Sequence, residues 1–241
     1  MAHSYKRILL KVSGEALAGD QSFGIEVPFL TAVAAQIAEV ARTGVEIAIV
    51  IGGGNIFRGM AGAADGTDRV TADQMGMLGT VINALALSNA IQRQGVPSTA
   101  FSAVAMPSVA DTFTARAAKS ALESGHVVVC GGGTGNPFFT TDTAAALKAI
   151  ELDCDVLLKG TKVDGVYSAD PMKHPDAARF DAISYDDVLR KDLRVMDTAA
   201  FALARDNNLP IIVYALDDSA KLIGVLGGKA RSTRVGNTQS Q

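Results

Sequence analysis

The 241-residue chain has no tryptophan, three histidines and only two cysteines. Cys130 and Cys154 lack the spacing of a metal-binding pair and lie in apolar stretches, which favours buried reduced thiols and a cytosolic protein over a disulfide framework. His3, His126 and His174 form no catalytic or metal-binding pattern. The composition therefore points away from disulfide-rich proteins and from chemistry that depends on histidine.

Positive charge and long apolar runs are also scarce. The 22 basic residues are outnumbered by 25 acidic ones, which argues against a general nucleic-acid binder. The longest apolar stretches are too short for a membrane span, and the first residues lead straight into a short strand, so we expect neither a membrane segment nor a signal peptide. A net negative protein that handles phosphates must gather its positive charge locally or use a metal ion.

Glycine is abundant, and it gathers where apolar runs stop. Three apolar, mostly β-branched runs each end at a glycine-containing turn: residues 8–12 before 13–15, 47–51 before 52–55, and 127–130 before 131–137. Each pattern predicts a buried strand followed by a tight turn, and a turn without Cβ atoms lets a ligand approach its amide groups. Any one of them could be a simple connecting turn. Together they predict a polyphosphate bound across one rim of a sheet.

Strand-like and helix-like patterns alternate along the chain, which predicts βα units and a mostly parallel sheet. Further strands are expected at 155–159 and 211–214, and helices at 28–43, 73–94, 111–123, 142–152, 198–207 and 217–226, with a polar tail after the last helix.

Three helix starts carry capping signals. Asp111 and Asp142 are expected to cap their helices, and Ser184 begins a capping-box pattern with Asp187. In the helix over 73–94, one apolar stripe is expected to face the core, and the small residues of its first turns suit close packing, either within the core or between subunits. The stripe is formed by Leu78, Ile82, Leu85 and Ile91.

Two cations follow the first two glycine turns. Lys11 ends a buried strand, which is costly unless its ammonium group meets an anion or reaches the surface. Arg58 follows the second glycine cluster by one helical turn, so its guanidinium could reach the same phosphate. Phe57 stands where a dinucleotide fingerprint needs glycine, and no segment has the spacing of a P-loop, so both of those motifs are excluded.

Two later segments could receive nucleosides. In residues 133–142, Phe138 and Phe139 could flank a base or ribose while neighbouring threonines bind its polar edges, or the two rings could plug the core. In residues 159–171, Tyr167 could stack on an adenine and Lys159 could reach a transferring phosphate, or the segment could be a hairpin with solvated charges.

The chain offers these phosphate-binding parts but no evident general base. An acceptor that is itself a phosphate monoester has a second pKa of about 6 and is mostly a dianion at neutral pH. Phosphoryl transfer to it needs no base, and the barrier is lowered by positioning, cationic side chains, amide groups and Mg²⁺.

At these four stretches the sequence resembles the bacterial uridylate kinases, a branch of the amino acid kinase family. The resemblance extends from residues 5–11 to Leu209-Pro210 and is most specific in residues 133–142 and 161–171. It implies an α/β protein built as a three-layer α/β/α sandwich with an open, mostly parallel central sheet, in one domain over residues 1–241. It also implies transfer of the γ-phosphoryl group of ATP to UMP, giving UDP and ADP for pyrimidine nucleotide biosynthesis in the cytoplasm, with Mg²⁺.

The resemblance implies roles for individual residues. Contacts to ATP are expected from the C-terminal part and the first two turns: Lys11, Val12, Ser13, Gly14, Gly54, Arg58, Thr161, Tyr167 and Asp170. Contacts to UMP are expected mostly from the third turn: Gly53, Asp73, Thr134, Gly135, Asn136, Pro137, Phe138, Phe139, Thr140 and Thr141. Lys11 and Arg58 would stabilise the transferring group, Asp142 would organise Mg²⁺ and the lysines, and no protein ligand of the metal is specified. Lys159 and Asp197 would complete the electrostatic frame.

Members of this family form hexamers that respond to GTP and UTP, so a homo-oligomer, most simply a hexamer, and these two effectors are expected. Two other functions stay open at this point. One is a sister kinase with a carboxylate or carbamate acceptor. The other is a nucleotide-binding storage or regulatory protein, which would not need Lys11, Arg58 and Asp142 together.

Overall fold

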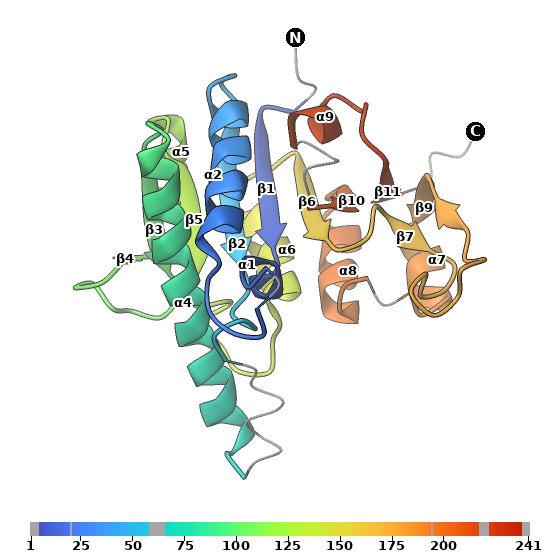
Figure 1. Cartoon of the computed structure of the whole chain (residues 1–241), viewed down its shortest axis with the longest axis horizontal. Coiled ribbons are helices and arrows are strands. Elements are labelled where there is room, and N and C mark those ends of the chain that lie inside the picture. The colour runs from blue at the N-terminus through green and yellow to red at the C-terminus, as the bar shows by residue number, and fades with distance from the viewer. Residues whose placement is uncertain (1–4, 20, 58–65, 194, 217–221, 238–241) are drawn as a thin grey trace.

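The computed structural model describes residues 5–19, 21–57, 66–193, 195–216 and 222–237. Within them, nine strands form one sheet in the order β4-β3-β5-β2-β1-β6-β10-β11-β9 (Figure 1). In that order the strands are Asp111–Thr112, Ser98–Ser102, Val127–Gly131, Glu46–Ile51, Arg7–Val12, Val156–Thr161, Ile211–Ala215, Ser232–Gly236 and Ala182–Ser184. Every neighbouring pair is parallel except β10 with β11, so the predicted open, mostly parallel sheet is confirmed.

Helices cover both faces of this sheet, which confirms the three layers (Figure 1). One face carries α2 (Val27–Ala41), α4 (Arg69–Arg93) and α9 (Leu222–Leu226), with the short α1 (Gly14–Leu17). The other carries α5 (Ala115–Glu123), α6 (Thr141–Glu151), α7 (Tyr185–Arg190) and α8 (Thr198–Asp206). A separate antiparallel pair, β7 (Val166–Tyr167) and β8 (Arg179–Phe180), lies beside the sheet.

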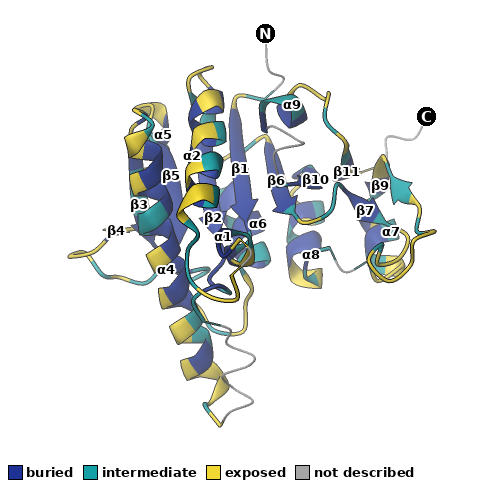
Figure 2. Cartoon of the chain, in the orientation of Figure 1, coloured by how far each residue is buried: buried dark blue, intermediate teal, exposed yellow. Residues whose placement is uncertain are grey.

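The central strands are buried on both faces, as Figure 2 shows. In β1, Ile8 and Leu10 enter one hydrophobic cluster while Leu9 enters the other. Strands enclosed in this way have continuous apolar sequences, which is why runs of apolar residues located them. Because β5, β2, β1 and β6 are adjacent and parallel, the three glycine turns that follow β5, β2 and β1 meet at the edge of the sheet formed by the carboxyl ends of its strands.

The long helix α4 differs from the prediction in its start and its buried face. It begins at Arg69 with Asp68 as its cap, since the Asp68 side chain accepts a hydrogen bond from the Thr71 amide. Leu78 is 49% exposed and Ile82 48% exposed. The predicted stripe was therefore wrong, because the helix packs instead through small and medium-sized side chains one position away: Met77, Val81, Ala84 and Leu87, with Ile91 the one buried member of the predicted set.

Two predicted caps were also wrong. Asp111 belongs to the edge strand β4, and Thr114 caps α5 by accepting from the Ala117 amide. Asp142 lies inside the first turn of α6, which Thr140 caps. The predicted cap at Ser184 is confirmed, because its hydroxyl oxygen accepts from the amide of the third helical residue of α7.

The strands β3 and β11 were not predicted. β3 (Ser98–Ser102) is rich in small polar residues, and β11 (Ser232–Gly236) lies in the segment expected to be a polar tail. Thr233 and Val235 turn inward in β11, which becomes a strand because β10 offers it an antiparallel partner. Residues 217–221 of the predicted last helix lie outside the described residues. Among the helices described, none is long and apolar enough to cross a membrane.

Candidate active site

Two lysines lie side by side at the edge of the sheet where the glycine turns meet. Lys11 of β1 is paired in register with Lys159 of β6. Both side chains are only 9% exposed. Two ammonium groups in this arrangement repel each other and lose much of their hydration, so they require an anion nearby.

Asp142 supplies that anion from the first turn of α6. Its Oδ1 lies 2.9 Å from Lys11 Nζ and its Oδ2 lies 2.6 Å from Lys159 Nζ. Burial by itself would raise the pKa of Asp142, but the two ammonium groups outweigh burial and hold this pKa below its usual range. The cluster of Lys11, Asp142 and Lys159 thus contains an ionised carboxylate and one positive charge in excess.

Lys159 is fixed more firmly than a lysine on a surface. Its ammonium group donates both to Asp142 and to the backbone carbonyl of Val195. Burial lowers the pKa of Lys159, and Asp142 opposes that effect only in part. The side chain therefore forms part of the preorganised site, held on two sides by α6 and by the segment that leads into α8.

Asp197 was predicted as part of the same electrostatic frame, and the structure places it against the start of α6. Its carboxylate caps α8 by accepting from the Ala200 amide at 2.8 Å. It also accepts from the hydroxyl of Thr143 at 2.8 Å and from that of Thr140. Within the described contacts it binds neither lysine, so it anchors the helix turn that carries Asp142.

The first two glycine turns touch each other through their backbones. A Cβ atom on Gly14 would lie 2.6 Å from the carbonyl oxygen of Gly52, and one on Gly53 would lie 2.8 Å from the carbonyl oxygen of Gly76 in α4. Real Cβ atoms do not approach backbone this closely, so only glycine permits the two turns to meet while the second rests on the helix.

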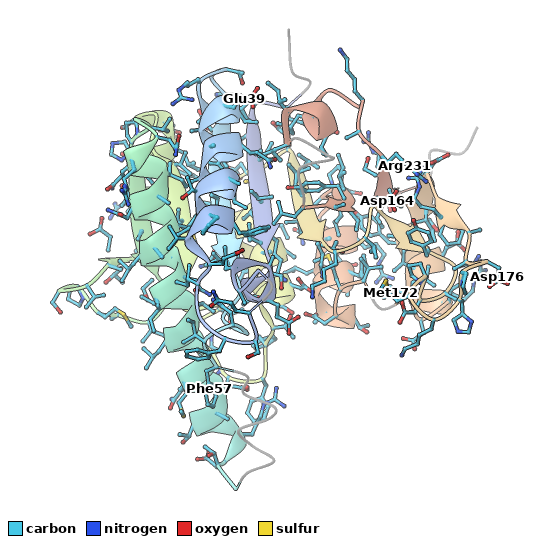
Figure 3. The ribbon with its side chains drawn as sticks, viewed as in Figure 1. Glu39, Phe57, Asp164, Met172, Asp176 and Arg231 are labelled. Atoms are coloured by element: carbon cyan, nitrogen blue, oxygen red, sulfur yellow. The ribbon has the colours of Figure 1, made fainter. Side chains whose placement is uncertain are left out.

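A cavity of about 220 Å³ opens beside the second and third turns. Predicted acceptor residues that line it are Gly53, Asp73, Thr134, Asn136, Phe139, Thr140 and Thr141. Gly135, Pro137 and Phe138 belong to the same loop without lining the cavity. The residues on the α4 side of the cavity were missed, as was Phe57, which lies beside the lower half of that helix in Figure 3. The missed α4 residues are Arg69, Ala72, Gly76, Met77 and Thr80. The helical spacing of positions 69, 73, 76 and 80 was the signal that could have found most of them.

Asp73 closes the loop over this cavity. Its Oδ2 accepts from Arg69 Nε at 2.8 Å and from the Phe138 amide at 2.8 Å. Phe138 has a φ of 71°, in the left-handed region, and the residue is 66% exposed. The carboxylate thus holds a strained backbone in place. Asp73 also lines the cavity, and its second oxygen makes no hydrogen bond with the described residues.

A second cavity, of about 490 Å³, lies beyond the carboxyl end of β6. It is lined by three of the residues predicted for ATP, namely Thr161, Tyr167 and Asp170. The hydroxyl of Tyr167 donates to Asp164, which also pairs with Arg231 at 3.1 Å; Figure 3 shows Asp164 and Arg231 close together. These contacts fix the ring that forms one wall of the cavity.

The remaining predicted ATP residues lie in or beside the first two turns. Val12 is buried at the end of β1, Ser13 precedes α1 without a side-chain cap, and Gly54 approaches Glu15 of α1. Their contribution to a ligand would come from backbone amides. Arg58 was predicted to bind the transferring phosphate, and it lies outside the described residues.

The described residues contain no group of three histidine, cysteine, aspartate or glutamate side chains that could hold a metal ion. Both oxygens of Asp142 already face lysines. A magnesium ion is commonly held by one or two carboxylates together with substrate phosphates. The donor set here fits an ion that arrives with a nucleotide, and does not fit a metal held by the protein alone.

Comparison with known proteins agrees with this architecture. The model of the amino acid kinase family matches residues 6–215. The chain belongs to this family. Its relatives within the family include a uridylate kinase of Bartonella henselae, 57% identical over 235 residues and 98% of each chain, and one of Brucella anthropi, 56% identical over 232 residues, 96% of this chain and 97% of that protein. The crystal structure of a UMP kinase from Bacillus anthracis superposes with a TM-score of 0.93 at 37% identity, over 98% of each chain.

Proposed function

We propose that this protein is a kinase that transfers the γ-phosphoryl group of ATP to UMP, giving UDP and ADP. One observation carries the proposal: close neighbours of Asp142 and Lys159, in the cluster with Lys11, line two separate cavities. Thr141, next to Asp142, lines the smaller cavity, and Thr161, two residues after Lys159, lines the larger. The relatives named uridylate kinase support UMP as the acceptor.

The chemistry follows from the charges of the cluster. A UMP phosphate is mostly a dianion at neutral pH, so no protein group has to remove a proton from it. Asp142 is ionised and engaged by both lysines, and it serves to hold their ammonium groups in place. Lys11 and Lys159 can then stabilise the negative charge that spreads over the transferring phosphoryl oxygens.

Each cavity has groups suited to one nucleotide. In the N-terminal part, UMP would bind against Gly53, the second oxygen of Asp73 would accept from ribose hydroxyls, and the loop over 134–141 would enclose the uracil. In the C-terminal part, Thr161, Tyr167 and Asp170 would hold the nucleoside of ATP, with its phosphates along residues 11–14 and Gly54. Both halves would belong to one domain over residues 1–241.

Magnesium would arrive with ATP and would screen the negative charge of its phosphates. We assign Arg58 to the transferring phosphate as a further cation. We further propose that the protein acts in pyrimidine nucleotide biosynthesis in the cytoplasm, with GTP and UTP as candidate effectors.

The exposed apolar side chains of α4 support self-association, with a homohexamer as the expected form. They form a face on the described part of the helix: Val70, Met75, Leu78 and Ile82.

The test is a coupled assay of ADP release with UMP, CMP, AMP, GMP and small carboxylate or carbamate acceptors. Turnover with UMP above all others is expected. Turnover only with an amino-acid-like acceptor would move the protein to a sister kinase. A Lys11→Ala variant should bind UMP but lose about 10³-fold in rate, roughly 4 kcal/mol of transition-state stabilisation; unchanged rates would contradict the role of the cluster.

A further inference from the structure

We propose that a buried pair of amides, Asn55 and Asn83, acts as a positioning device that aligns the two phosphate-binding turns for phosphoryl transfer. Asn55 follows the glycines of the second turn, and Asn83 lies in the middle of α4. The inference rests on the proposed function, since it assigns to these residues the alignment of donor and acceptor phosphates.

The two side chains are bonded to each other and to the backbone around them. Asn83 is fully buried and Asn55 is 2% exposed. Asn83 Nδ2 donates to Asn55 Oδ1 at 2.6 Å, and Asn55 Nδ2 donates back to Asn83 Oδ1 at 3.1 Å. Asn83 Nδ2 also donates to the Gly52 carbonyl at 2.7 Å, and Asn55 Nδ2 to the Gly24 carbonyl at 2.8 Å. Both of these hydrogen bonds from the pair to other described residues go to a backbone carbonyl of a loop or turn.

The bond to Gly52 orients the peptide that leads into the second turn. In a trans peptide the carbonyl oxygen and the following N–H point in opposite directions. With the Gly52 oxygen held toward α4 by Asn83, the N–H of Gly53 is directed away from that oxygen. Gly53 lines the acceptor cavity, so the amide pair sets the direction of a donor that the acceptor phosphate would meet.

The same pair sets the distance between the two turns. The Gly52 amide donates to the Val12 carbonyl at 2.9 Å, which joins the second turn to the end of β1. A Cβ atom on Gly14 would lie 2.6 Å from the Gly52 oxygen and 2.7 Å from Asn55 Oδ1. The backbone of the donor-side turn thus rests on the carbonyl and the amide that Asn83 holds. A shift of either asparagine would be transmitted to both turns.

Attachment of α4 to the sheet does not require this pair. Ala84, Leu87 and Ile91 already bury the helix in the hydrophobic core. The two buried amides instead fix the orientation of the backbone groups that they bind, because hydrogen bonds are directional and apolar contacts are not. A fully bonded polar network also makes its surroundings more rigid. The pair therefore serves the geometry of the turns.

The experiment compares Asn83→Ala, Asn83→Ser and Asn55→Ala with a matched control, Ser88→Ala. Ser88 is a buried residue of the same helix, and its hydroxyl shares a hydrogen bond with that of Ser98. Both serines are far along the chain from the two phosphate-binding turns. Single-turnover rates of UMP phosphorylation and the KM of both nucleotides are measured on the folded fraction, together with melting temperatures. The Asn83→Ser variant keeps one hydrogen-bond donor, the serine hydroxyl. It provides the comparison if Asn83→Ala does not fold.

We expect Asn83→Ala to lower the rate of transfer roughly 10- to 100-fold, as a misplacement of about 1 Å would, with KM values changed less than about threefold. The transfer rate of Asn83→Ser should lie between those of the wild type and Asn83→Ala. A double variant that combines Asn55→Ala with Asn83→Ala should transfer no more slowly than the slower single variant. Ser88→Ala should keep the wild-type rate. Equal rate losses in Asn83→Ala and Ser88→Ala, an effect confined to KM, or unchanged transfer would each overturn the inference. If the wild-type protein itself does not phosphorylate UMP, the proposed function fails instead.

Discussion

Lys11 and Lys159 occupy paired positions on neighbouring parallel strands, and their ammonium groups contact the two oxygens of the same carboxylate. The strand register places the two lysines side by side, and the first turn of α6 places Asp142 between them. The arrangement stores positive charge in a buried site at the edge of the sheet. Four predictions follow from it and from its surroundings.

Replacing Asp142 by asparagine should damage both stability and catalysis. The change leaves two buried ammonium groups facing each other without an anion, and breaking a buried ion pair typically costs about 3 kcal/mol or more of the free energy of unfolding. Denaturant unfolding and the ADP-release assay measure the two effects. Asp153→Asn is the control. Asp153 pairs with Lys119, but its side chain is 72% exposed, so loss of this ion pair should change the unfolding free energy by less than about 1 kcal/mol. Equal effects of the two substitutions would contradict the assigned role of the cluster.

The stability of the protein should depend on Asp142 in acid. The folded-state pKa of Asp142 lies below the ordinary aspartate value of about 3.9. Between these two values the unfolded chain binds more protons than the folded one, so the stabilisation is present above about pH 4 and is lost as pH falls through the folded-state pKa. Urea unfolding from pH 6 to pH 2.5 should show a weaker acid dependence in Asp142→Asn than in the wild type. Parallel curves would show that other carboxylates determine acid stability.

Lys148 should oppose folding at neutral pH. Its side chain lies in the α6 layer, its residue is 3% exposed, and its Nζ is 3.3 Å from the centre of the Phe113 ring. Burial lowers the pKa of Lys148 below the ordinary lysine value of about 10.4, so the unfolded state binds more protons in the interval between them. Stability due to this group therefore rises with pH across that interval.

A Lys148→Met variant should remove this alkaline rise and be at least as stable as the wild type at pH 7. Lys119→Met is the control, because the Lys119 side chain in α5 is 29% exposed. Unfolding free energies at pH 7 and pH 10 make the comparison. A loss of stability at pH 7 in Lys148→Met alone would mean that the contact with the aromatic ring outweighs the cost of burying the ammonium group.

Adding a methyl group to Gly53 should displace the second turn. The new Cβ would lie 2.8 Å from the Gly76 carbonyl oxygen and 2.9 Å from the Thr80 amide, both of them backbone atoms of α4. We expect Gly53→Ala to reduce kcat/KM for UMP by about 10²-fold, since a displacement of about 1 Å has that effect on a positioned reactant. Gly224→Ala meets only an ordinary contact at 3.8 Å and should leave activity unchanged. Wild-type kinetics in Gly53→Ala would mean that the turn does not approach the acceptor.

Much of this architecture can be read from local patterns. Strands β1, β2 and β5 were located because burial on both faces makes their sequences continuously apolar, and the glycines that follow them mark the turns. Residues 133–142 and 161–171 carried the resemblance to a family, and the matched family model and relatives confirm it. The loop that lines the smaller cavity and the wall of the larger one were named from the same segments.

Other features could not be read locally. The face that α4 buries depends on which of two apolar stripes fits the sheet, and the structure selects small side chains over Leu78 and Ile82. The strand β11 exists because β10 offers it a partner, although its own composition is polar. Asn83 showed no signal in the sequence, because its importance comes from a turn 31 positions away.

Local signals were enough to locate the strands β1, β2, β5, β6 and β10, the glycine turns, and the candidate lysines and carboxylate. Local backbone preferences and the alternation of apolar residues act over a few positions, and these features need no more. The contacts of Lys11 and Lys159 with one carboxylate, and the hydrogen bonds between Asn55 and Asn83, arise only in the folded chain. Contacts between distant segments depend on register and helix rotation, which the packing of the whole core sets.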